Sequence, residues 1–346
     1  MGLSIKDIVP KKDIELSELS GKTICVDAFN TLYQFLTTIR QQDGTPLMDS
    51  KKRITSHLSG IFYRNIKLLS EGIKLIYVFD GKAPKLKCKT HENRTEHKKE
   101  AREKYEQAKK SENISEMKKY SSQLARLDAE IISESKELLQ AMGIQVIQAP
   151  SEGEAEASHL TRINKEIFAT ASQDYDSLLF GTPRLLQNLT LARKRKTQYG
   201  WVEVKTQLID LERVLNELEI NLDQLICLGI LVGTDYNPKG IPGIGQKKAL
   251  DIVRKHKQPV LIFKSVEEQL MSIPEEDRFD WQEIFHIFHH HSVEDKEIEF
   301  PKLDEDKIKE ILVKEHDFSR ERVEKQLSKL KDIEKRKKQK GLNEWF

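Results

Sequence analysis

The sequence has little of what marks a secreted or membrane-bound chain. It holds three cysteines among 346 residues, Cys25, Cys88 and Cys227. Their odd number and wide spacing exclude a disulfide framework and a zinc finger. No apolar run approaches the roughly 20 residues that span a bilayer, and the first residues lack the apolar stretch of a signal peptide. We therefore expect reduced thiols in an intracellular protein without membrane contact.

The sequence also lacks a large net charge, which is only +2. The charge is unevenly distributed, because residues 82–110 and 320–340 each carry a net charge of +6, leaving about −10 for the rest. Two cationic segments beside an anionic body suit a protein that grips a polyanion and performs metal chemistry next to it. Solvated helix faces are the alternative explanation for either segment alone.

Four short runs rich in β-branched residues alternate with helical patterns. They are residues 23–26, 74–79, 144–148 and 167–171. This alternation predicts an α/β fold with a mostly parallel central sheet flanked by helices. With 38% hydrophobic residues, the chain is long enough for a full core with one or two appended subdomains.

The pattern between and after these runs suggests a division of the chain. Residues 54–72 repeat apolar positions at helical spacing and stop at Gly72. The following residues are rich in helix formers, but at first without an apolar stripe, which predicts a helical excursion outside the sheet. We divide the chain into five parts. Residues 1–80 and 132–220 form the two parts of the core, and residues 81–131 form the cap between them. Residues 221–330 form a helical region with a glycine-rich turn, and residues 331–346 form a basic tail.

Acidic residues follow each of the four predicted strands. The carboxyl ends of parallel strands share one edge of the sheet, where open α/β folds bind their ligands, so these side chains should converge. A seventh acid, in "GTDYN", is a weaker candidate because the same residues also form a turn. The candidates are Asp27, Asp80, Glu152, Glu154, Asp174, Asp176 and Asp235.

Each of these acids also has a purely structural explanation. Asp27 suits a helix cap, Asp80 before Gly81 suits a turn, and Ser151 with Glu154 has the spacing of a capping box. Clustered carboxylates, however, raise one another's pKa values unless cations neutralise them. Oxygen ligands without Cys or His indicate two Mg²⁺ ions, or Mn²⁺ in their place, about 4 Å apart. The pattern therefore predicts phosphodiester hydrolysis by two-metal catalysis.

Seven segments spread over nearly the whole chain carry a resemblance to a known family. They are "VDAFNTLYQFL", "YVFDGKAPKLK", "APSEGEAEA", "SQDYDSLLFG", "LVGTDY", "GIPGIGQKKAL" and "QKGLNEWF". In this order they resemble the flap endonucleases, structure-specific 5′ nucleases of DNA replication and repair, and the short tail is closest to archaeal members. The resemblance implies a PIN-like 5′-nuclease fold, a helical cap through which the flap passes, and a two-metal site formed by the seven acids.

The resemblance also implies roles for residues around the site. Lys87 and Arg94 fall where the family keeps two basic residues facing the scissile phosphate, and seven residues apart they lie two turns along one helix face. Tyr33 falls where an aromatic ring stacks on a base near the cut. Thr55 and Arg64 resemble the portion that receives the 3′ end. Without the resemblance, Lys87 and Arg94 read as surface residues and Tyr33 equally as a core residue.

The segment "GIPGIGQKKAL" is a glycine turn that opens a helix. Its amide groups and helix N-terminus suit a phosphate, held directly or through a bound cation. It resembles the helix-hairpin-helix type that contacts duplex DNA without reading its sequence, and in the family such a turn often holds K⁺. The residues we assign to this contact are Gly243, Gly245, Lys247 and Lys248.

The last eight residues end a basic segment with exposed apolar groups. Leu342 and Trp345 are three apart, so one helical turn would place them together as a plug for a hydrophobic groove. With Gln339 and Phe346, the spacing resembles the peptide that docks on the sliding clamp of replication. Docking of the tail onto its own body is the alternative.

These observations predict a Mg²⁺-dependent endonuclease that cuts branched DNA near the junction of a single-stranded 5′ flap with duplex, with 5′–3′ exonuclease activity. Okazaki-fragment processing and repair are the settings that the resemblance implies, in the nucleoid, or the nucleus of a eukaryote. A junction or bubble nuclease and a general 5′ exonuclease are alternatives within the same chemistry. A clamp-tethered DNA-binding scaffold with structural acids is the alternative without catalysis.

Overall fold

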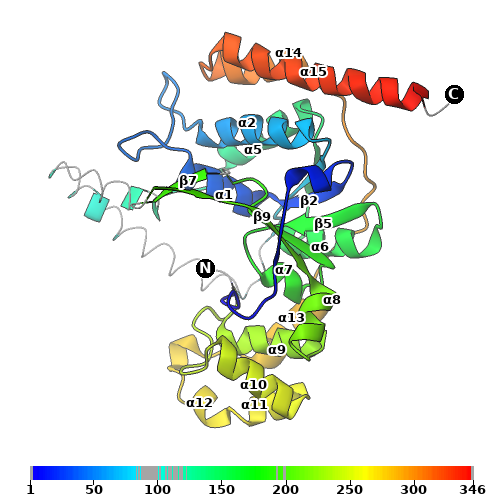
Figure 1. Cartoon of the computed structure of the whole chain (residues 1–346). Helices are drawn as coiled ribbons and strands as arrows, with labels where there is room; N and C mark the ends of the chain where they lie inside the picture. Colours follow the sequence, from blue (N-terminus) through cyan, green and yellow to red (C-terminus); the bar gives the residue numbers. More distant parts are fainter. Residues whose placement is uncertain are drawn as a thin grey trace.

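The computed structural model describes two long stretches, residues 3–82 and 200–343, and much of the chain between them. Between them it describes residues 84, 86, 100, 103–105, 107, 111, 116, 120–121, 123–191 and 194–197. For residues 194–197, 201 and 332–343 the structure describes the backbone but not the side chains. A central sheet separates two groups of helices, and a helical region hangs below it in Figure 1.

The sheet has seven strands in the order β1-β9-β6-β5-β2-β3-β4. Five neighbouring strands are parallel, whereas β9 pairs antiparallel with both β6 and β1 at the other edge. The strands are β1 Lys12–Ile14, β2 Thr23–Asp27, β3 Lys74–Phe79, β4 Gln145–Gln148, β5 Ile167–Ala171, β6 Arg184–Gln187 and β9 Thr206–Asp210. A separate hairpin joins β7 (Lys194–Thr197) to β8 (Gly200–Glu203).

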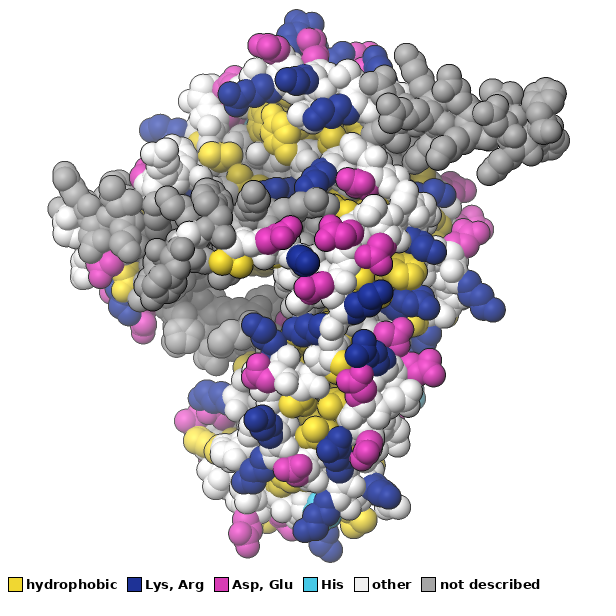
Figure 2. Space-filling view, in the orientation of Figure 1, with side chains coloured by type: hydrophobic (Ala, Val, Ile, Leu, Met, Phe, Trp, Pro, Cys, Tyr) yellow, Lys and Arg dark blue, Asp and Glu magenta, His cyan; other side chains and the backbone are white. Residues whose placement is uncertain are grey.

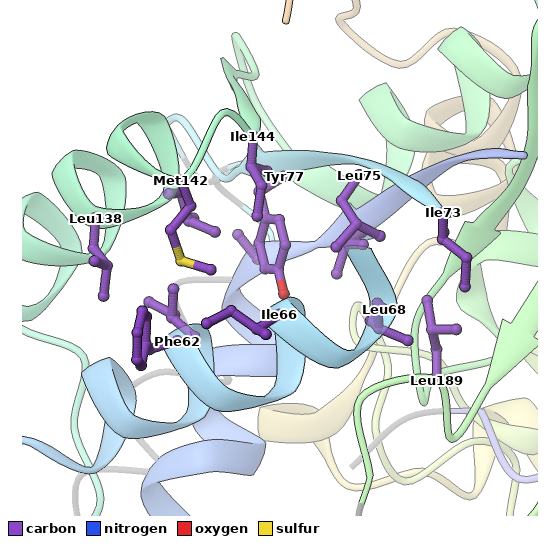
Figure 3. Packing of buried hydrophobic residues seen from close by; sticks show 14 of the residues in the cluster. Phe62, Ile66, Leu68, Ile73, Leu75, Tyr77, Leu138, Met142, Ile144 and Leu189 are labelled. Atoms are coloured by element: carbon purple, nitrogen blue, oxygen red, sulfur yellow. The ribbon is translucent and has the colours of Figure 1, made fainter. Parts of the chain in front are cut away.

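Both faces of the central strands are buried, which explains their continuous apolar sequence. Alternate residues point to opposite faces, so Tyr77 of β3 packs toward α2 (Ser56–Ser70) and α5 (Ala129–Ala141), as Figure 3 shows. On the other face, Cys25 and Val78 belong to a smaller cluster beneath α6 (Gly153–Ile163). The strands are therefore rigid supports for whatever follows their carboxyl ends.

The helical region has its own core, which also takes in the N-terminal segment. Leu3, Ile5 and Val9 are buried in it, so residues 3–11 run from the sheet toward α9 and α10 (Figure 1). The short helix α7 (Asp176–Leu179) lies beneath the sheet and contributes to this core. The other helices of the region are α8 Leu211–Glu217, α9 Leu222–Val232, α10 Gln246–His256, α11 Pro259–Lys264, α12 Glu267–Met271 and α13 Trp281–His289. No helix in the described part of the chain is long and apolar enough to cross a bilayer.

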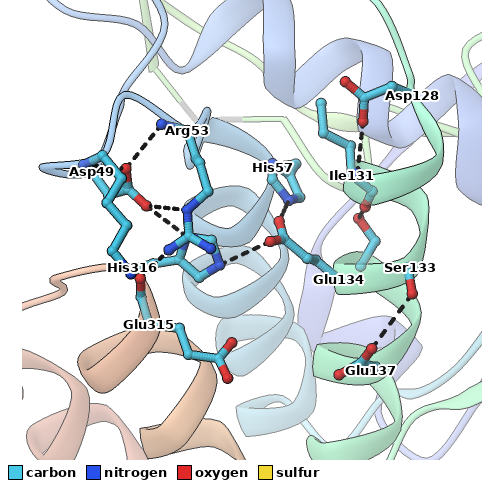
Figure 4. Close-up of polar contacts among 12 residues, drawn as sticks. Asp49, Arg53, His57, Asp128, Ile131, Ser133, Glu134, Glu137, Glu315 and His316 are labelled. Carbon is cyan, nitrogen blue, oxygen red and sulfur yellow. Dashed lines mark hydrogen bonds and ion pairs between the residues drawn. The ribbon is translucent and has the colours of Figure 1, made fainter.

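The last helices return to the opposite side of the sheet. In Figure 1, α14 (Glu305–Lys309) and α15 (Arg320–Asn343) lie beside α2 and α5. A buried polar cluster fastens them there (Figure 4): Glu134 of α5 lies 3.1 Å from Nε2 of His57 and 3.0 Å from Nε2 of His316. Nδ1 of His316 is in turn 3.2 Å from Asp49, which pairs with Arg53 at 2.8 Å.

The predicted α/β class is confirmed, and the four predicted strands are the four adjacent strands β5, β2, β3 and β4. The predicted helix 54–72 is α2, and Gly72 adopts a left-handed φ of 83° just beyond its end. Cys25 and Cys227 are buried free thiols, as expected. Cys88 and most of the proposed cap 81–131 lie outside the described residues, and the division into five parts remains a proposal.

Candidate active site

The site lies where the chain reverses its direction across the sheet. From β2 the chain moves to β3 and β4 on one side, then returns to β5 on the other side of β2. Ligands of open α/β sheets bind at such a switch point, beyond the carboxyl ends of the strands. Val26 pairs with Ala171 at the ends of β2 and β5, so the residues that follow, Asp27 and Ser172, meet at this point.

Ser172 links two of the predicted carboxylates. Its Oγ lies 3.1 Å from Oδ2 of Asp27 and 2.8 Å from Oε1 of Glu154. Oδ1 of Asp27 also accepts a hydrogen bond from the amide of Asn30 at 3.0 Å, so Asp27 caps α1 (Ala28–Thr38) as well. The structural and functional explanations for Asp27 therefore apply together.

The side chain of Asp80 meets the backbone at the start of α6, at the residue that follows Glu152. The amide of Gly153 donates a hydrogen bond to Oδ1 of Asp80 at 2.6 Å. A Cβ at Gly153 would lie 2.7 Å from that oxygen and 3.1 Å from the carbonyl oxygen of Val78, so only glycine permits this contact. The capping box proposed for Ser151 is wrong, because Glu152 is the N-cap residue and the hydroxyl of Ser151 donates to the carbonyl of Lys82.

Glu152 is held from the helical region. The phenol of Tyr236 donates a hydrogen bond to Oε2 of Glu152, and both side chains are buried. The Tyr236 loop is fixed by Asn237, whose Oδ1 accepts from the Thr234 hydroxyl at 2.8 Å and whose Nδ2 donates to a carbonyl of α9. Asp235 is therefore carried by a rigid turn rather than a mobile loop.

Asp174 faces Asp235 across the same rim. Burial, followed by the charge of Asp235, raises the pKa of Asp174 above its ordinary value. The amide of Leu3 donates to Oδ1 of Asp174 at 3.1 Å. Asp176 begins α7 and is buried, and its charge is one of those that raise the pKa of Tyr236, after burial and Glu152.

The third glutamate of "SEGEAEA" points elsewhere. Glu156 is fully buried under the sheet, where its Oε2 accepts the amide of Glu294 at 3.0 Å. Its Oε1 has no hydrogen-bond partner within the described structure. Burial raises the pKa of Glu156. It therefore fastens residues 292–300 to α6 and is not part of the rim.

The rim suits a hard divalent cation by its chemistry. Its donors are all carboxylate oxygens, which Mg²⁺ and Mn²⁺ prefer. The pKa of Asp174 is raised by burial and then by the charge of Asp235, and a nearby cation would oppose both effects. Among the residues that the structure describes, no three acidic, His or Cys side chains converge closely enough to hold one ion. The residue types fit such ions, and the ligand assignment remains a proposal.

Three further predicted contacts lie on one side of this rim. Tyr33 is exposed on α1, with 39% of its surface accessible, which suits stacking on a base. Arg64, on α2, is half-buried beside Lys67 and Lys205 in a small hollow of about 30 Å³. Thr55, by contrast, is buried, so its side chain offers no open surface to DNA.

The glycine-rich turn precedes α10. Gly243 has a φ of 74° and Gly245 is the N-cap residue of the helix, and a Cβ at either would meet nothing within 4 Å. Lys247 and Lys248 are exposed, and Nζ of Lys248 donates to the carbonyl of Gly243 at 3.3 Å. The turn therefore presents open backbone and two cations.

Four predicted residues lie outside the described part: Lys87 and Arg94 of the cap, and Trp345 and Phe346 of the tail. Gln339 and Leu342 lie in α15, but their side chains are not described. On the face of the molecule that Figure 2 shows, the described basic and acidic side chains are intermixed rather than gathered by sign.

Two contacts of the rim were not predicted from the sequence. Ser172 and Tyr236 each stand within two residues of a predicted acid, in "SQDYD" and "TDYN". That adjacency is the available signal, because a hydroxyl beside a carboxylate commonly orients it. The contact between the amide of Leu3 and Asp174 could not be predicted from the sequence, because almost every residue has a backbone amide and no residue type marks this one.

Comparison with known proteins agrees with this fold. Residues 3–101 match the XPG N-terminal domain and residues 143–235 the XPG I-region. The chain is 49% identical to "Flap endonuclease 1" of Pyrococcus abyssi, over all of this chain and 98% of that protein. It is 45% identical to the protein of the same name from Aeropyrum pernix, over all of both chains. These domains define a nuclease that acts on DNA. More narrowly, the chain belongs to the flap endonuclease family.

Solved structures give the same result. Flap endonuclease-1 from Methanococcus jannaschii matches 97% of this chain and all of its own, with a TM-score of 0.75 and 38% identity. The catalytic core of Rad2 in complex with DNA substrate, at 22% identity and a TM-score of 0.67, shares the fold over 95% of this chain and all of its own. The predicted family is thereby confirmed.

Proposed function

We propose that the protein hydrolyses a phosphodiester of branched DNA near the junction of a single-stranded 5′ flap with duplex, using two Mg²⁺ ions. The observation that carries the proposal is that Ser172, at the switch point of the sheet, lies within hydrogen-bonding distance of the carboxylates of Asp27 and Glu154 and accepts the backbone amide of Asp174. The names of the relatives support the choice of a DNA flap as substrate.

When bound, the two ions would activate a water molecule and stabilise the leaving oxygen of an in-line displacement. The seven acids of the rim would hold them. Ser172 orients Asp27 and Glu154, and Tyr236 orients Glu152, each by a hydrogen bond to a carboxylate oxygen. Lys87 and Arg94 would add positive charge beside the transferred phosphate.

Substrate contacts would lie on both sides of the rim. Tyr33 would stack on a base near the cut, and the turn at Gly243 and Gly245 would hold the duplex backbone, with K⁺ as a further ion there. Arg64 would neutralise a phosphate on the side that receives the 3′ end, with Thr55 shaping the loop before α2. The C-terminal peptide, from Gln339 to Phe346, would tether the enzyme to a sliding clamp.

The experiment compares a labelled 5′-flap substrate, a nicked duplex and a four-way junction, each with Mg²⁺ and with EDTA. We expect the flap to be cut fastest, and EDTA to abolish cutting. Asp176→Asn should lower the single-turnover rate at least about 100-fold while DNA remains bound. Asp295→Asn is the matched control, because Asp295 is exposed and pairs only with His159 in the described structure.

Equal cutting of the three substrates would contradict flap specificity. Undiminished cutting by Asp176→Asn would contradict a catalytic role for Asp176. Absence of cutting by the wild type, with unaffected DNA processing when Asp176→Ala replaces it in a reconstituted repair assay, would favour the alternative of a scaffold whose acids are structural. Full activity in EDTA would contradict the divalent metals.

A further inference from the structure

A lysine of the N-terminal segment contacts the loop that carries Asp174 and Asp176. Lys11 lies on the N-terminal segment, immediately before β1, and is half-buried. Its Nζ donates a hydrogen bond to the phenol oxygen of Tyr175, which stands between the two aspartates.

A second contact of Lys11 reaches the other side of Asp174. Nζ of Lys11 lies 3.5 Å from Oε1 of Gln187, the last residue of β6. Nε2 of Gln187 donates to the carbonyl oxygen of Gln173 at 3.0 Å. An ammonium group has three hydrogens to donate, so Lys11 can serve both partners at once. Both residues that flank Asp174 are thus connected to Lys11.

The segment that presents Lys11 is itself anchored. Ile5 and Val9 are buried in the helical core, and Leu3 contacts Asp174 directly. Asp7 exchanges two hydrogen bonds with Gln246, the first residue of α10: its amide donates to Oε1 at 3.2 Å and its Oδ2 accepts from Nε2 at 2.5 Å. Lys11 therefore extends from a fixed backbone, and its ammonium is held near the loop.

We propose that Lys11 is a positioning residue of the enzyme, which holds the 173–175 loop so that Asp174 and Asp176 face the rim. This inference rests on the proposed function, because it assigns to Lys11 the orientation of two of the proposed metal ligands. Residues that orient metal ligands typically change metal affinity or activity by 10- to 100-fold when replaced. Lys11 acts through Tyr175 and Gln187 and touches no reacting atom.

The test uses Lys11→Met in the full-length protein, with Lys12→Met as the matched control. Lys12 is the next residue, exposed, and pairs only loosely with Glu18 at 3.9 Å. We expect Lys11→Met to lower the single-turnover rate on a 5′ flap about 10-fold, with unchanged DNA affinity measured in Ca²⁺. Lys11→Arg should restore most of the rate, since a guanidinium keeps the charge and the donors. Lys12→Met should match the wild type.

A second readout is independent of cutting. Titration with Mn²⁺ in the absence of DNA, followed by electron paramagnetic resonance, should show affinity about 10-fold weaker for Lys11→Met than for the wild type. Tyr175→Phe, which removes the hydroxyl partner and keeps the buried ring, should give a similar change. Because both act through one contact, the double variant should be no worse than the worse single variant.

The outcomes separate this inference from the proposed function. Should the wild type cut no flap with Mg²⁺, the proposed function is wrong. If the wild type cuts and folded Lys11→Met matches it in rate and in Mn²⁺ affinity, the positioning role alone is overturned. A loss confined to DNA affinity would also overturn it, because Lys11 would then be a phosphate contact. Circular dichroism confirms that each variant is folded, and Tyr175→Phe tests the same contact independently.

Discussion

The phenol of Tyr236 donates a hydrogen bond to the carboxylate of Glu152, across 84 residues of sequence. Tyr236 follows α9 in the helical region, whereas Glu152 precedes α6 under the sheet. One buried hydrogen bond therefore joins the two halves of the molecule at the rim where the acids gather.

Replacing Tyr236 by phenylalanine should weaken both the fold and the reaction. The change leaves a buried carboxylate without this donor, which costs about 1–3 kcal/mol of unfolding free energy. The rate of flap cutting should fall about 10-fold or more, because Glu152 loses its orientation. Urea unfolding and single-turnover kinetics measure the two effects.

Tyr77→Phe is the control for that experiment. Tyr77 is fully buried and donates to Oδ1 of Asn65 in α2 at 2.9 Å, so its hydroxyl contacts none of the rim acids. It should lose stability with an unchanged rate. An equal loss of rate in both variants would mean that the effect of Tyr236 is one of general stability.

Ser172→Ala should affect the reaction through two carboxylates at once. The hydroxyl lies within hydrogen-bonding distance of Asp27 and Glu154, so its removal leaves both with one fewer polar neighbour. We expect a rate about 10- to 100-fold lower at constant DNA affinity. Ser158→Ala, also buried but bonded to a backbone carbonyl of α7, should leave the rate unchanged. Wild-type activity of Ser172→Ala would contradict an orienting role.

Glu156→Gln should stabilise the protein at neutral pH. Burial raises the pKa of Glu156, so the folded state binds a proton more readily than the unfolded state, and wild-type stability falls as pH rises through that pKa. Glutamine removes the buried charge and still accepts the amide of Glu294, which predicts a gain on the order of 1 kcal/mol at pH 7. The gain should vanish in acid.

Denaturation curves at pH 7 and pH 4 test this, with the exposed Glu166→Gln as control. Because Glu156 lies away from the rim, the rate of cutting should not change. A destabilised Glu156→Gln at pH 7 would show that the carboxylate is needed as a charge.

The cluster around Glu134 predicts loss of stability below neutral pH. Burial lowers the pKa of His57, and the hydrogen bond and charge of Glu134 only partly oppose this effect. Of the other groups that face the ring, His316 lowers the pKa further and Asp128 raises it. An unfolded histidine binds its proton near pH 6.5. Between that value and the lower folded pKa, the unfolded state holds more protons, so stability falls as pH decreases.

The free energy of unfolding of the wild type should therefore drop between pH 7 and pH 5, by at most about 1.4 kcal/mol per pH unit from this group. His57→Gln should show a shallower slope, whereas the exposed His286→Gln should follow the wild type. Equal slopes for all three proteins would remove His57 as the cause.

The sheet was predictable where its strands are central. β2, β3 and β5 are inner strands buried on both faces, so each leaves a continuous apolar run in the sequence, whereas the edge strand β4 is only partly buried and has two apolar residues between glutamines. β6 and β9 have polar residues among their few apolar ones, and β1 has only three residues, so no continuous apolar run marks them. The antiparallel edge could be known only from the structure.

The candidate site was also predictable only in part. That the acids share one edge followed from parallel topology alone, because the ends of parallel strands coincide. The side chains that hold them did not follow, since Ser172 meets Asp27 over 145 residues and Lys11 meets Tyr175 over 164. Such contacts are decided by packing, and a single sequence has no local pattern for them.

The anchoring of the N-terminal segment bears on how the molecule assembles during synthesis. Asp7 leaves the ribosome early, but its partner Gln246 follows 239 residues later, a delay on the order of 10 to 50 seconds at the usual rate of translation. Leu3, Ile5 and Val9 have no helical core to enter during that time. The rim should therefore close only late in translation, which would keep a half-made chain from acquiring nuclease activity.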